Sequence, residues 1–309
     1  MSTLLITHSA CLDHQNPLGH PERPDRLRAI ERVLEHERFM ALAREQAPRA
    51  EPEIMTLCHP ARYVEQIREA VPTQGLVRLD ADTSMSPGSF EAASRAVGGA
   101  TLAVDEVMTG KVLNAFVATR PPGHHAEPEI PMGFCLFNNA AIAARYGQRR
   151  YGAERAAIVD FDVHHGNGSQ AIFWSDPTVM YCSTHEMPLY PGTGSVRERG
   201  EHDNIVNAPL RAGDGGEQFR EAFETSILPR LREFRPDLIV ISAGFDAHMR
   251  DPLANLNLSE ADFGWATQKI MEVADASGGG RVVSVLEGGY DLEGLARSVA
   301  AHVTALMRG

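Results

Sequence analysis

Short apolar runs rich in β-branched residues alternate with longer amphipathic segments along most of this chain, and this alternation constrains the fold more than any other feature. Between the runs, apolar residues recur every three or four positions, the spacing of one helix face. Such alternation predicts an α/β protein in which helices cover both faces of a mostly parallel sheet. We therefore expect a three-layer α/β/α architecture and, because no linker interrupts the pattern, a single domain over residues 1–309.

The alternation also places the expected elements along the chain. We expect strands at residues 3–7, 114–119, 156–162, 179–183, 237–242 and 281–286. We expect helices after residue 24, near 60–70, and at 89–109, 137–149, 167–174, 216–233, 259–276 and 292–307. Polar motifs directly follow several of these strands. Because ligands bind at the carboxyl ends of strands in open parallel sheets, the motifs predict one shared site.

Charge and cysteine usage exclude several classes of partner. The chain has 41 acidic and 29 basic residues, and its formal net charge of −12 repels nucleic acid phosphates and anionic membranes. The apolar run at residues 3–7 is too short for a signal peptide, and no stretch is long enough to cross a bilayer. The four cysteines are scattered, as expected for reduced thiols. We expect a cytoplasmic protein with no nucleic acid or membrane partner.

Residues 160–167 carry the strongest chemical signal. Side chains alternate along a strand, so Asp160, Asp162 and His164 are predicted to share one face. Three ionisable groups on a buried strand are strongly destabilising unless a divalent metal neutralises them. Asp246 follows the apolar strand at 237–242 and is the expected third ligand beside Asp162 and His164. Three ligands leave a fourth position open, as in a catalytic zinc site. The alternative explanation for these acidic residues is that they cap helices or make buried hydrogen bonds.

Two further motifs supply candidates for proton transfer and hydrogen bonding. His124 and His125 follow a rigid Pro-Pro-Gly turn at a strand end, which favours proton handling near neutral pH. Asp160 is positioned in the sequence to orient one of these histidines, and Asn167 to orient the other. Tyr290 follows two glycines at another strand end, where a phenol can donate a hydrogen bond to an oxyanion. Structural roles for the histidines and simple packing for the tyrosine are the alternatives.

These motifs resemble those of the metal-dependent histone deacetylases, especially the class II branch and its bacterial relatives, the histone deacetylase-like and acetylpolyamine amidohydrolases. The matching motifs occur in family order almost end to end: HPERP (20–24), RPPGHH (120–125), GFC (133–135), DFDVHHGNG (160–168), AGFD (243–246) and EGGY (287–290). The resemblance implies the arginase/deacetylase fold and a deacetylase catalytic domain. It also implies one Zn²⁺ per chain and hydrolysis of the amide of an acylated amine.

The resemblance assigns a role to each polar residue of these motifs. Asp162, His164 and Asp246 would hold the zinc. His125 would be the general base that activates the attacking water and later protonates the leaving amine, while His124, backed by Asp160, would support the developing charge. Tyr290 would donate a hydrogen bond to the acyl oxygen. Asn167 stands where class I relatives have an aspartate, so we expect a neutral partner and a less basic His125.

Family members also bind potassium. The resemblance implies one structural K⁺ beside the zinc. Backbone carbonyls near Asp160, Asp162 and His164 would hold it, together with Ser183. It implies a second K⁺ at backbone carbonyls around Phe173, Asp176 and Val179. Carbonyl ligation leaves no trace in side-chain identity, so these two sites stand on the resemblance alone.

The same resemblance indicates how substrate is held. Phe134 and Tyr190 would form the walls of a narrow tunnel around an acyl-lysine stem, next to Gly133, although core packing is the alternative for both aromatics. Asp82 would lie at the rim and accept hydrogen bonds from the substrate, or could simply be solvated. Leu253 stands where the polyamine-selective class II deacetylase has a glutamate. Leucine offers no partner to a distal ammonium, which favours acyl-lysine or a small acyl-amide over acetylpolyamine as substrate.

Two other interpretations compete with that of a zinc-dependent deacetylase. A binuclear manganese hydrolase of the same fold needs extra carboxylates, but His248 and the segment 165–167 stand where these would be. A non-catalytic acyl-lysine binding protein would need to have lost the catalytic groups, which are all present. The sequence leaves open the physiological substrate, the preferred acyl length, Zn²⁺ against Fe²⁺, and the oligomeric state.

Overall fold

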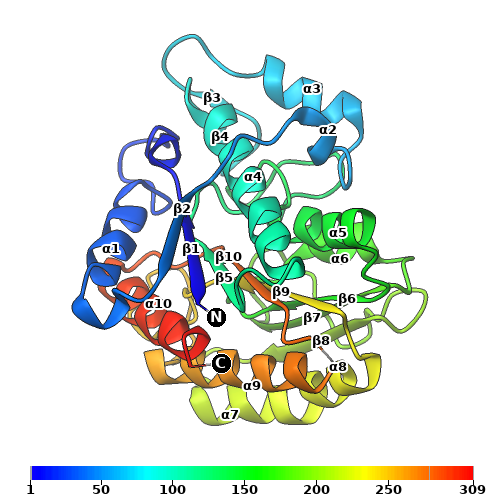
Figure 1. The fold of residues 1–309 in the computed structure, drawn as a ribbon. Coiled ribbons are helices and arrows are strands. Elements are labelled where there is room, and N and C mark those ends of the chain that lie inside the picture. Colours follow the sequence, from blue (N-terminus) through cyan, green and yellow to red (C-terminus); the bar gives the residue numbers. More distant parts are fainter. Residues whose placement is uncertain (1, 278, 309) are drawn as a thin grey trace.

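The computed structural model describes residues 2–277 and 279–308, and an eight-stranded sheet forms its centre (Figure 1). The strands lie in the order β2-β1-β5-β10-β9-β6-β7-β8, and every pairing in this sheet is parallel. Their bounds are β1 Thr3–Thr7, β2 Ala43–Gln46, β5 Asn114–Val117, β6 Ala156–Asp160, β7 Val179–Glu186, β8 Ile205–Leu210, β9 Leu238–Ala243 and β10 Val282–Leu286. The expected parallel sheet is confirmed.

Helices cover both faces of this sheet, and a short antiparallel pair lies outside it. The pair consists of β3 Val77–Arg78 and β4 Ser84–Met85. The α-helices are α1 Asp25–Leu34, α2 Pro52–Met55, α3 Ala61–Glu69, α4 Ser89–Met108, α5 Asn139–Tyr151, α6 Asn167–Phe173, α7 Gly216–Ala222, α8 Leu228–Phe234, α9 Glu260–Ala276 and α10 Leu292–Leu306. Two 3₁₀ turns, η1 Ser9–Leu12 and η2 Glu37–Phe39, and a π-helical turn, η3 Phe223–Ile227, complete the set.

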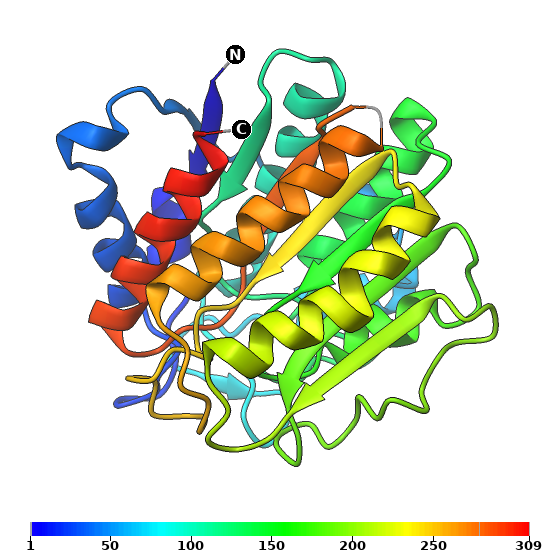
Figure 2. The same cartoon turned by 90° about the horizontal axis from the view of Figure 1, so that it is seen from below.

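Alternate residues of the central strands face the two helical layers. Ile158 and Val240 belong to the apolar cluster that includes residues of α4 and α5, whereas Val159 and Ile241 belong to the cluster with α1 and α7 to α10. In Figure 1 the sheet separates α4 and α5 above it from α7, α9 and α10 below it. Figure 2 shows the helices of this lower layer in front of the sheet, running roughly along the strands. The inner strands are rich in apolar residues because both faces of the sheet are buried there.

Both edge strands were missing from the sequence expectation. The β2 strand is a polar and mostly exposed segment that pairs with β1 in the sheet. The β8 strand contains Asn207 and Pro209, residue types that are depleted in strands. Proline is tolerated on an edge strand because one row of its backbone groups needs no partner. Neither edge shows the apolar pattern by which the inner strands were recognised.

The helix expected at 216–233 is broken by a π-helical turn. The structure has α7, then η3, then α8, with Pro229 at the start of α8. Proline lacks the N–H that would donate to the carbonyl four residues earlier, and its ring crowds that carbonyl. A single π turn lets the chain continue in the same direction past this break.

The strand expected at 156–162 ends two residues early, at Asp160, so the argument that three side chains alternate along it was wrong in detail. The Asp160 carboxylate accepts a hydrogen bond from the Asp162 backbone N–H (3.1 Å), and Asp162 accepts one from the His164 N–H (2.9 Å). These side chain-to-backbone bonds replace the sheet ladder and turn the chain. Asp162 and His164 therefore project from a loop rather than from a strand.

Candidate active site

Three potential metal ligands converge at the carboxyl edge of the sheet. Asp162 and His164 come from the loop after β6, and Asp246 comes from the loop after β9. The Nδ1 atom of His164 lies 3.1 Å from Asp162 Oδ1 and 3.2 Å from Asp246 Oδ2. One donor atom from each residue lies within 4.8 Å of the others, and all three residues are buried. The structure thus brings together the set that the sequence predicted.

Backbone groups hold the two carboxylates of this set in place. The Val163 N–H donates to Asp246 (2.9 Å), and the Gly288 N–H donates to Asp162 (2.8 Å). A Cβ atom on Gly288 would lie 2.0 Å from the Asp246 carboxylate, which no side chain could tolerate. The glycine after Glu287 is therefore required by the close approach of its backbone to the ligands.

The electrostatics of the three residues favour a cation between them. Burial disfavours a charged imidazole, but hydrogen bonds from His164 to Asp162 and Asp246 outweigh burial and raise its pKa to about 10. Burial, followed by repulsion from Asp162, raises the pKa of Asp246. Two buried carboxylates thus hold one positive charge, and a divalent ion would supply it more fully than a proton. Two oxygen donors and one imidazole also suit zinc, so the residues present fit this metal.

The tandem histidines each have the partner expected from the sequence. The Nδ1 of His124 lies 2.9 Å from the Asp160 carboxylate, and the Nδ1 of His125 lies 2.8 Å from the Asn167 amide oxygen. Asp160 also accepts a hydrogen bond from the Tyr181 hydroxyl (3.0 Å). These contacts fix the orientation of both rings. Asn167 contacts Nδ1 of His125 and not its Nε2.

The two rings have opposite protonation preferences. Burial opposes a charge on His124, but the carboxylates of Asp160 and Asp162 outweigh it and raise its pKa well above the usual range. Burial, then the positive charges on His124 and His164, hold the pKa of His125 well below its usual range. One imidazole therefore carries a charge while its neighbour stays neutral and able to accept a proton.

Tyr290 lies on the loop after β10 and is 9% exposed. Its ring meets the Phe134 ring edge-on, with centroids 5.9 Å apart, and the Arg26 guanidinium lies 5.0 Å from its centroid. Burial and then the negative charge of Asp246 raise the pKa of this phenol well above 10. The hydroxyl therefore keeps its proton and can act as a hydrogen-bond donor.

A cavity of about 240 Å³ opens at His164, one of the three candidate ligands. Its lining contains every residue that the sequence analysis connected with substrate, together with Leu189, which that analysis missed: Asp82, His125, Gly133, Phe134, His164, Leu189, Tyr190, Leu253 and Tyr290. Asp82 is held at the rim, where it accepts a hydrogen bond from the Gly133 N–H (3.1 Å). A Cβ on Gly133 would lie 2.3 Å from the His125 ring, so glycine leaves room for that imidazole.

Two acidic residues that position this site were not singled out from the sequence. The Glu287 carboxylate accepts hydrogen bonds from the backbone N–H groups of Gly123 (2.7 Å) and His124 (3.1 Å). The Asp251 carboxylate accepts one from the Tyr290 N–H (2.7 Å). Glu287 could have been found, because it is an acid directly after the largely apolar strand β10, much as Asp160 is an acid at the end of β6. Asp251 lies on a loop and carries no comparable signal.

A buried ionic cluster connects the N-terminal motif to the Tyr290 loop. Glu22 pairs with Arg26 (3.1 Å) and with Arg120 (2.7 Å), and all three side chains are fully buried. Arg26 also donates to the Gly289 carbonyl (2.7 Å), directly before the tyrosine. The single carboxylate and several backbone carbonyls accept the hydrogen bonds of the two guanidinium groups, as buried charges require.

Within the described ranges, none of the helices combines the length and the apolar character needed to cross a membrane. The four cysteines are free thiols, three of them buried.

Ser183 pairs with Asp160 across β6 and β7, and its hydroxyl lies 2.9 Å from His185 Nδ1.

Comparison with known proteins agrees with this geometry. Residues 20–306 match the histone deacetylase domain family. The chain is 40% identical to the histone deacetylase-like amidohydrolase of Pseudomonas aeruginosa over 278 residues, covering 88% of this chain and 73% of that protein. It is 38% identical to a probable deacetylase of Archaeoglobus fulgidus over 318 residues, covering all of this chain and 87% of that protein.

A solved structure shares the whole fold. The HDA15 HD domain superimposes with a TM-score of 0.94 at 35% sequence identity, covering 99% of this chain and 88% of that one. The parallel sheet and its two helical layers are therefore the arginase/deacetylase fold expected from the motifs. Fold, site geometry and sequence similarity agree that this chain belongs to the histone deacetylase family.

Proposed function

We propose that this protein is a zinc-dependent deacetylase that hydrolyses the amide of an acylated amine, either acetyl-lysine or a small acyl-amide. The observation that carries the proposal is the convergence of Asp162, His164 and Asp246 beside a cavity that His125 and Tyr290 also line. Metal ligands, a neutral imidazole and a phenol donor around one cavity are the groups that amide hydrolysis by an activated water requires.

Asp162, His164 and Asp246 would hold the zinc ion, one per chain. When bound, zinc would polarise the acyl carbonyl and lower the pKa of the attacking water molecule. Binding would displace the proton that the two carboxylates otherwise stabilise on His164.

His125 is the proposed general base. Its Nδ1 faces Asn167, so Nε2 is the nitrogen that takes the proton of the attacking water and later gives it to the leaving amine. His124, held protonated by Asp160, places a fixed positive charge beside the negative charge that develops on the acyl group. The Tyr290 hydroxyl donates a hydrogen bond to the acyl oxygen.

The cavity favours an aliphatic acylated side chain as substrate. Phe134 and Tyr190 supply aromatic walls, and Asp82 at the rim is placed to accept hydrogen bonds from a substrate backbone. Leu253 lines the same cavity with an apolar side chain, which gives a second ammonium group no partner. We therefore propose acyl-lysine rather than acetylpolyamine as the substrate class. We also propose a structural K⁺ at the carbonyls near Asp160, beside Ser183.

An acyl-substrate panel assayed with metal-reconstituted protein tests the proposal. The metal-free protein is loaded with Zn²⁺, Fe²⁺ or Mn²⁺ and given lysine peptides of increasing acyl length, together with acetylspermidine. We expect turnover of acetyl-lysine peptides with one equivalent of Zn²⁺, and a loss of about 10²–10³ in kcat for Tyr290→Phe with zinc binding unchanged.

Three outcomes would contradict this proposal. Two tightly bound ions needed for turnover would favour a binuclear hydrolase. Binding of acyl-lysine without turnover would favour a non-catalytic binding protein. A higher kcat/KM for acetylspermidine than for any peptide would overturn the substrate class, and Leu253→Glu serves as the matched variant that should move selectivity toward the polyamine.

A further inference from the structure

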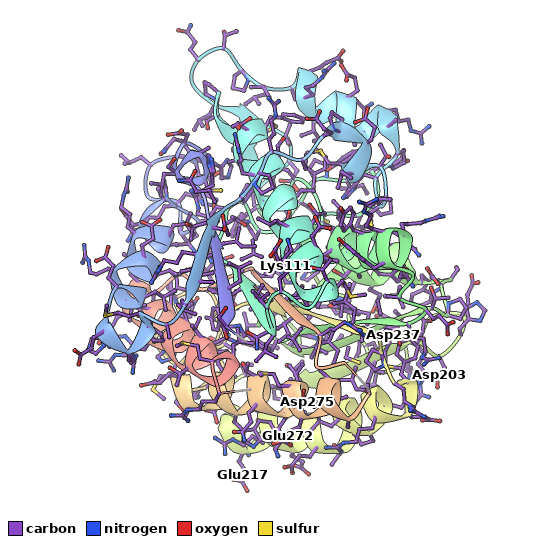
Figure 3. All side chains as sticks on the ribbon, viewed as in Figure 1. Lys111, Asp203, Glu217, Asp237, Glu272 and Asp275 are labelled. Atoms are coloured by element: carbon purple, nitrogen blue, oxygen red, sulfur yellow. The ribbon has the colours of Figure 1, made fainter. Side chains whose placement is uncertain are left out.

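Three backbone carbonyl oxygens converge on a single side-chain nitrogen at the amino ends of β7 and β8. The Nδ2 of Asn204 donates to the carbonyls of Phe173 (2.8 Å), Asp176 (3.0 Å) and Val179 (2.9 Å). Phe173 ends α6, Val179 begins β7, and Asn204 directly precedes β8. The asparagine is 3% exposed, although Asp203 before it lies at the surface (Figure 3).

These are the three carbonyls at which the sequence resemblance predicts a second potassium ion. A cation bound there would have to lie between the oxygens, and the structure places the amide nitrogen at that point. The two amide hydrogens carry partial positive charge and satisfy the same lone pairs that a cation would. We propose that the Asn204 amide replaces the second potassium ion, so that this chain binds no monovalent cation at these carbonyls.

The orientation of the amide follows from its contacts. A flipped amide would direct Oδ1 at three carbonyl oxygens, which repel it, so the nitrogen must face them. The Oδ1 atom is buried without a hydrogen-bond partner, a cost that three donated bonds offset. Gly200 packs against this oxygen so closely that an added Cβ would lie 2.5 Å from it. The side chain is therefore confined and has little room to rotate away and admit an ion.

The charges around the carbonyls also disfavour a further cation. The Asp176 carboxylate already pairs with Arg145 (2.7 Å) and accepts hydrogen bonds from the Thr178 hydroxyl (2.6 Å) and N–H (2.9 Å). The same guanidinium lies 5.1 Å from the centre of the Phe173 ring. Arg145 thus places a positive charge beside the three carbonyls, and it neutralises the Asp176 carboxylate.

The replacement ties one end of a catalytic element to the sheet. Helix α6 begins at Asn167, the partner of His125, and ends at Phe173, whose carbonyl has no partner within the helix. That carbonyl accepts hydrogen bonds from the Asp176 N–H (3.1 Å) and from Asn204, which joins it to the first residue of β7. The far end of α6 is therefore anchored by hydrogen bonds from a side chain of the protein rather than by an ion taken from solution.

Anomalous scattering from crystals soaked in Tl⁺ tests the proposal. Wild-type crystals should show no thallium peak at the three carbonyls. Asn204→Gly, which removes the amide and leaves the carbonyls, should show one, and its Tm should rise when K⁺ replaces choline in the buffer. Thr178→Ala is the matched control, because it loosens the same turn but keeps the amide, and it should show no peak.

A peak at these carbonyls in the wild-type protein would overturn the proposal. The absence of a peak in both the wild type and Asn204→Gly would overturn it as well, because the carbonyls would then form no cation site for the amide to replace. Should the glycine variant fail to fold, Asn204→Ser provides a second vacated site. None of these results depends on enzymatic activity, so they are independent of the proposed function.

Discussion

Single carboxylates in this protein both shape the chain and prepare its chemistry. Asp160 ends β6 by accepting a backbone hydrogen bond, and the same side chain orients His124. Asp162 turns the chain toward His164 while offering its other oxygen to the Gly288 N–H. Because each acid has two oxygens, one can fix the loop while the other faces the site. Folding and catalysis are therefore difficult to separate at these positions.

The neutral partner of His125 makes a prediction about the acidic side of the pH–rate profile. Asn167→Asp would place a negative charge 2.8 Å from Nδ1, where an amide oxygen now lies. An adjacent carboxylate favours the protonated imidazole, so the pKa of His125 should rise by one unit or more, roughly. Because the base acts when neutral, the acidic limb of kcat/KM should move to higher pH. An unmoved limb would refute the assignment, and Asn167→Ser, which adds no charge, is the control.

Sequence reasoning succeeded best for residues whose chemistry conflicts with their surroundings. Asp162, His164 and Asp246 were recognisable because charged groups directly follow apolar strands, and the structure brings them within one cluster. Asp251 could not be recognised in this way, since an acid on a loop is ordinary. Its function depends on the Tyr290 N–H, 39 residues away, which only the folded chain brings close.

At the scale of elements, the inner strands were predictable and the edges were not. Inner strands such as β9 are buried on both faces and must be apolar, which leaves a strong pattern in the sequence. The edge strand β2 is held by backbone hydrogen bonds to β1 and shows no such pattern. The early end of β6 was missed because the Asp160 side chain, rather than the strand propensity of the following residues, decides where pairing stops.

Asp251 makes a prediction about how two loops cooperate. Its carboxylate accepts hydrogen bonds from the Tyr290 N–H (2.7 Å) and the Leu253 N–H (3.0 Å), so it joins the loop after β9 to the loop after β10. Asp251→Ala should let the phenol move and lower kcat roughly 10- to 100-fold, since small misplacements are costly in catalysis. Asp251→Asn keeps one acceptor oxygen and should retain more activity. Isothermal titration with zinc should show unchanged affinity, and weakened zinc binding would contradict a purely positioning role.

At the scale of the whole molecule, the metal ligands connect strands that are far apart in the sequence. Asp162 and Asp246 follow β6 and β9, which are neighbours in the sheet. Along the chain, residues 161–237, 77 in all, lie between the end of β6 and the start of β9.

Zinc removal should therefore lower global stability. A ligand present at a hundred times its Kd stabilises the folded state by about 2.7 kcal/mol, so chelation should lower Tm by several degrees. Restoring Zn²⁺ should reverse the change. Asp246→Asn should show little difference with and without zinc in the same thermal melts, and an identical Tm for wild-type protein in both conditions would contradict the site.

A buried histidine makes the stability of the molecule sensitive to acid. His302 lies between the hydroxyls of Thr267 (2.6 Å) and Ser284 (2.9 Å), and burial lowers its pKa to about 3. The unfolded chain binds this proton below about pH 6.5, whereas the folded protein does not until the pH nears 3. The stability that comes from keeping His302 neutral is therefore fully present above the unfolded-state pKa of about 6.5, and it is lost as the pH falls from there toward 3.

The measurement is the free energy of unfolding in urea at several pH values. Relative to His302→Gln, the wild type should lose up to about 1.4 kcal/mol per pH unit below pH 6.5. The exposed His202→Gln should follow the wild-type curve. Parallel curves for wild type and His302→Gln would show that His302 does not contribute to acid sensitivity.

The buried ionic cluster has a consequence for where this protein can be cut. Arg120 donates to the carbonyls of Cys11 (2.8 Å) and His14 (3.2 Å) as well as to Glu22, and β1 lies between two other strands. A truncation to residues 20–306, the region that the family match covers, would strip a buried guanidinium of two acceptors and remove a strand from inside the sheet. The cooperative folding unit therefore extends upstream of the segment by which the family is recognised.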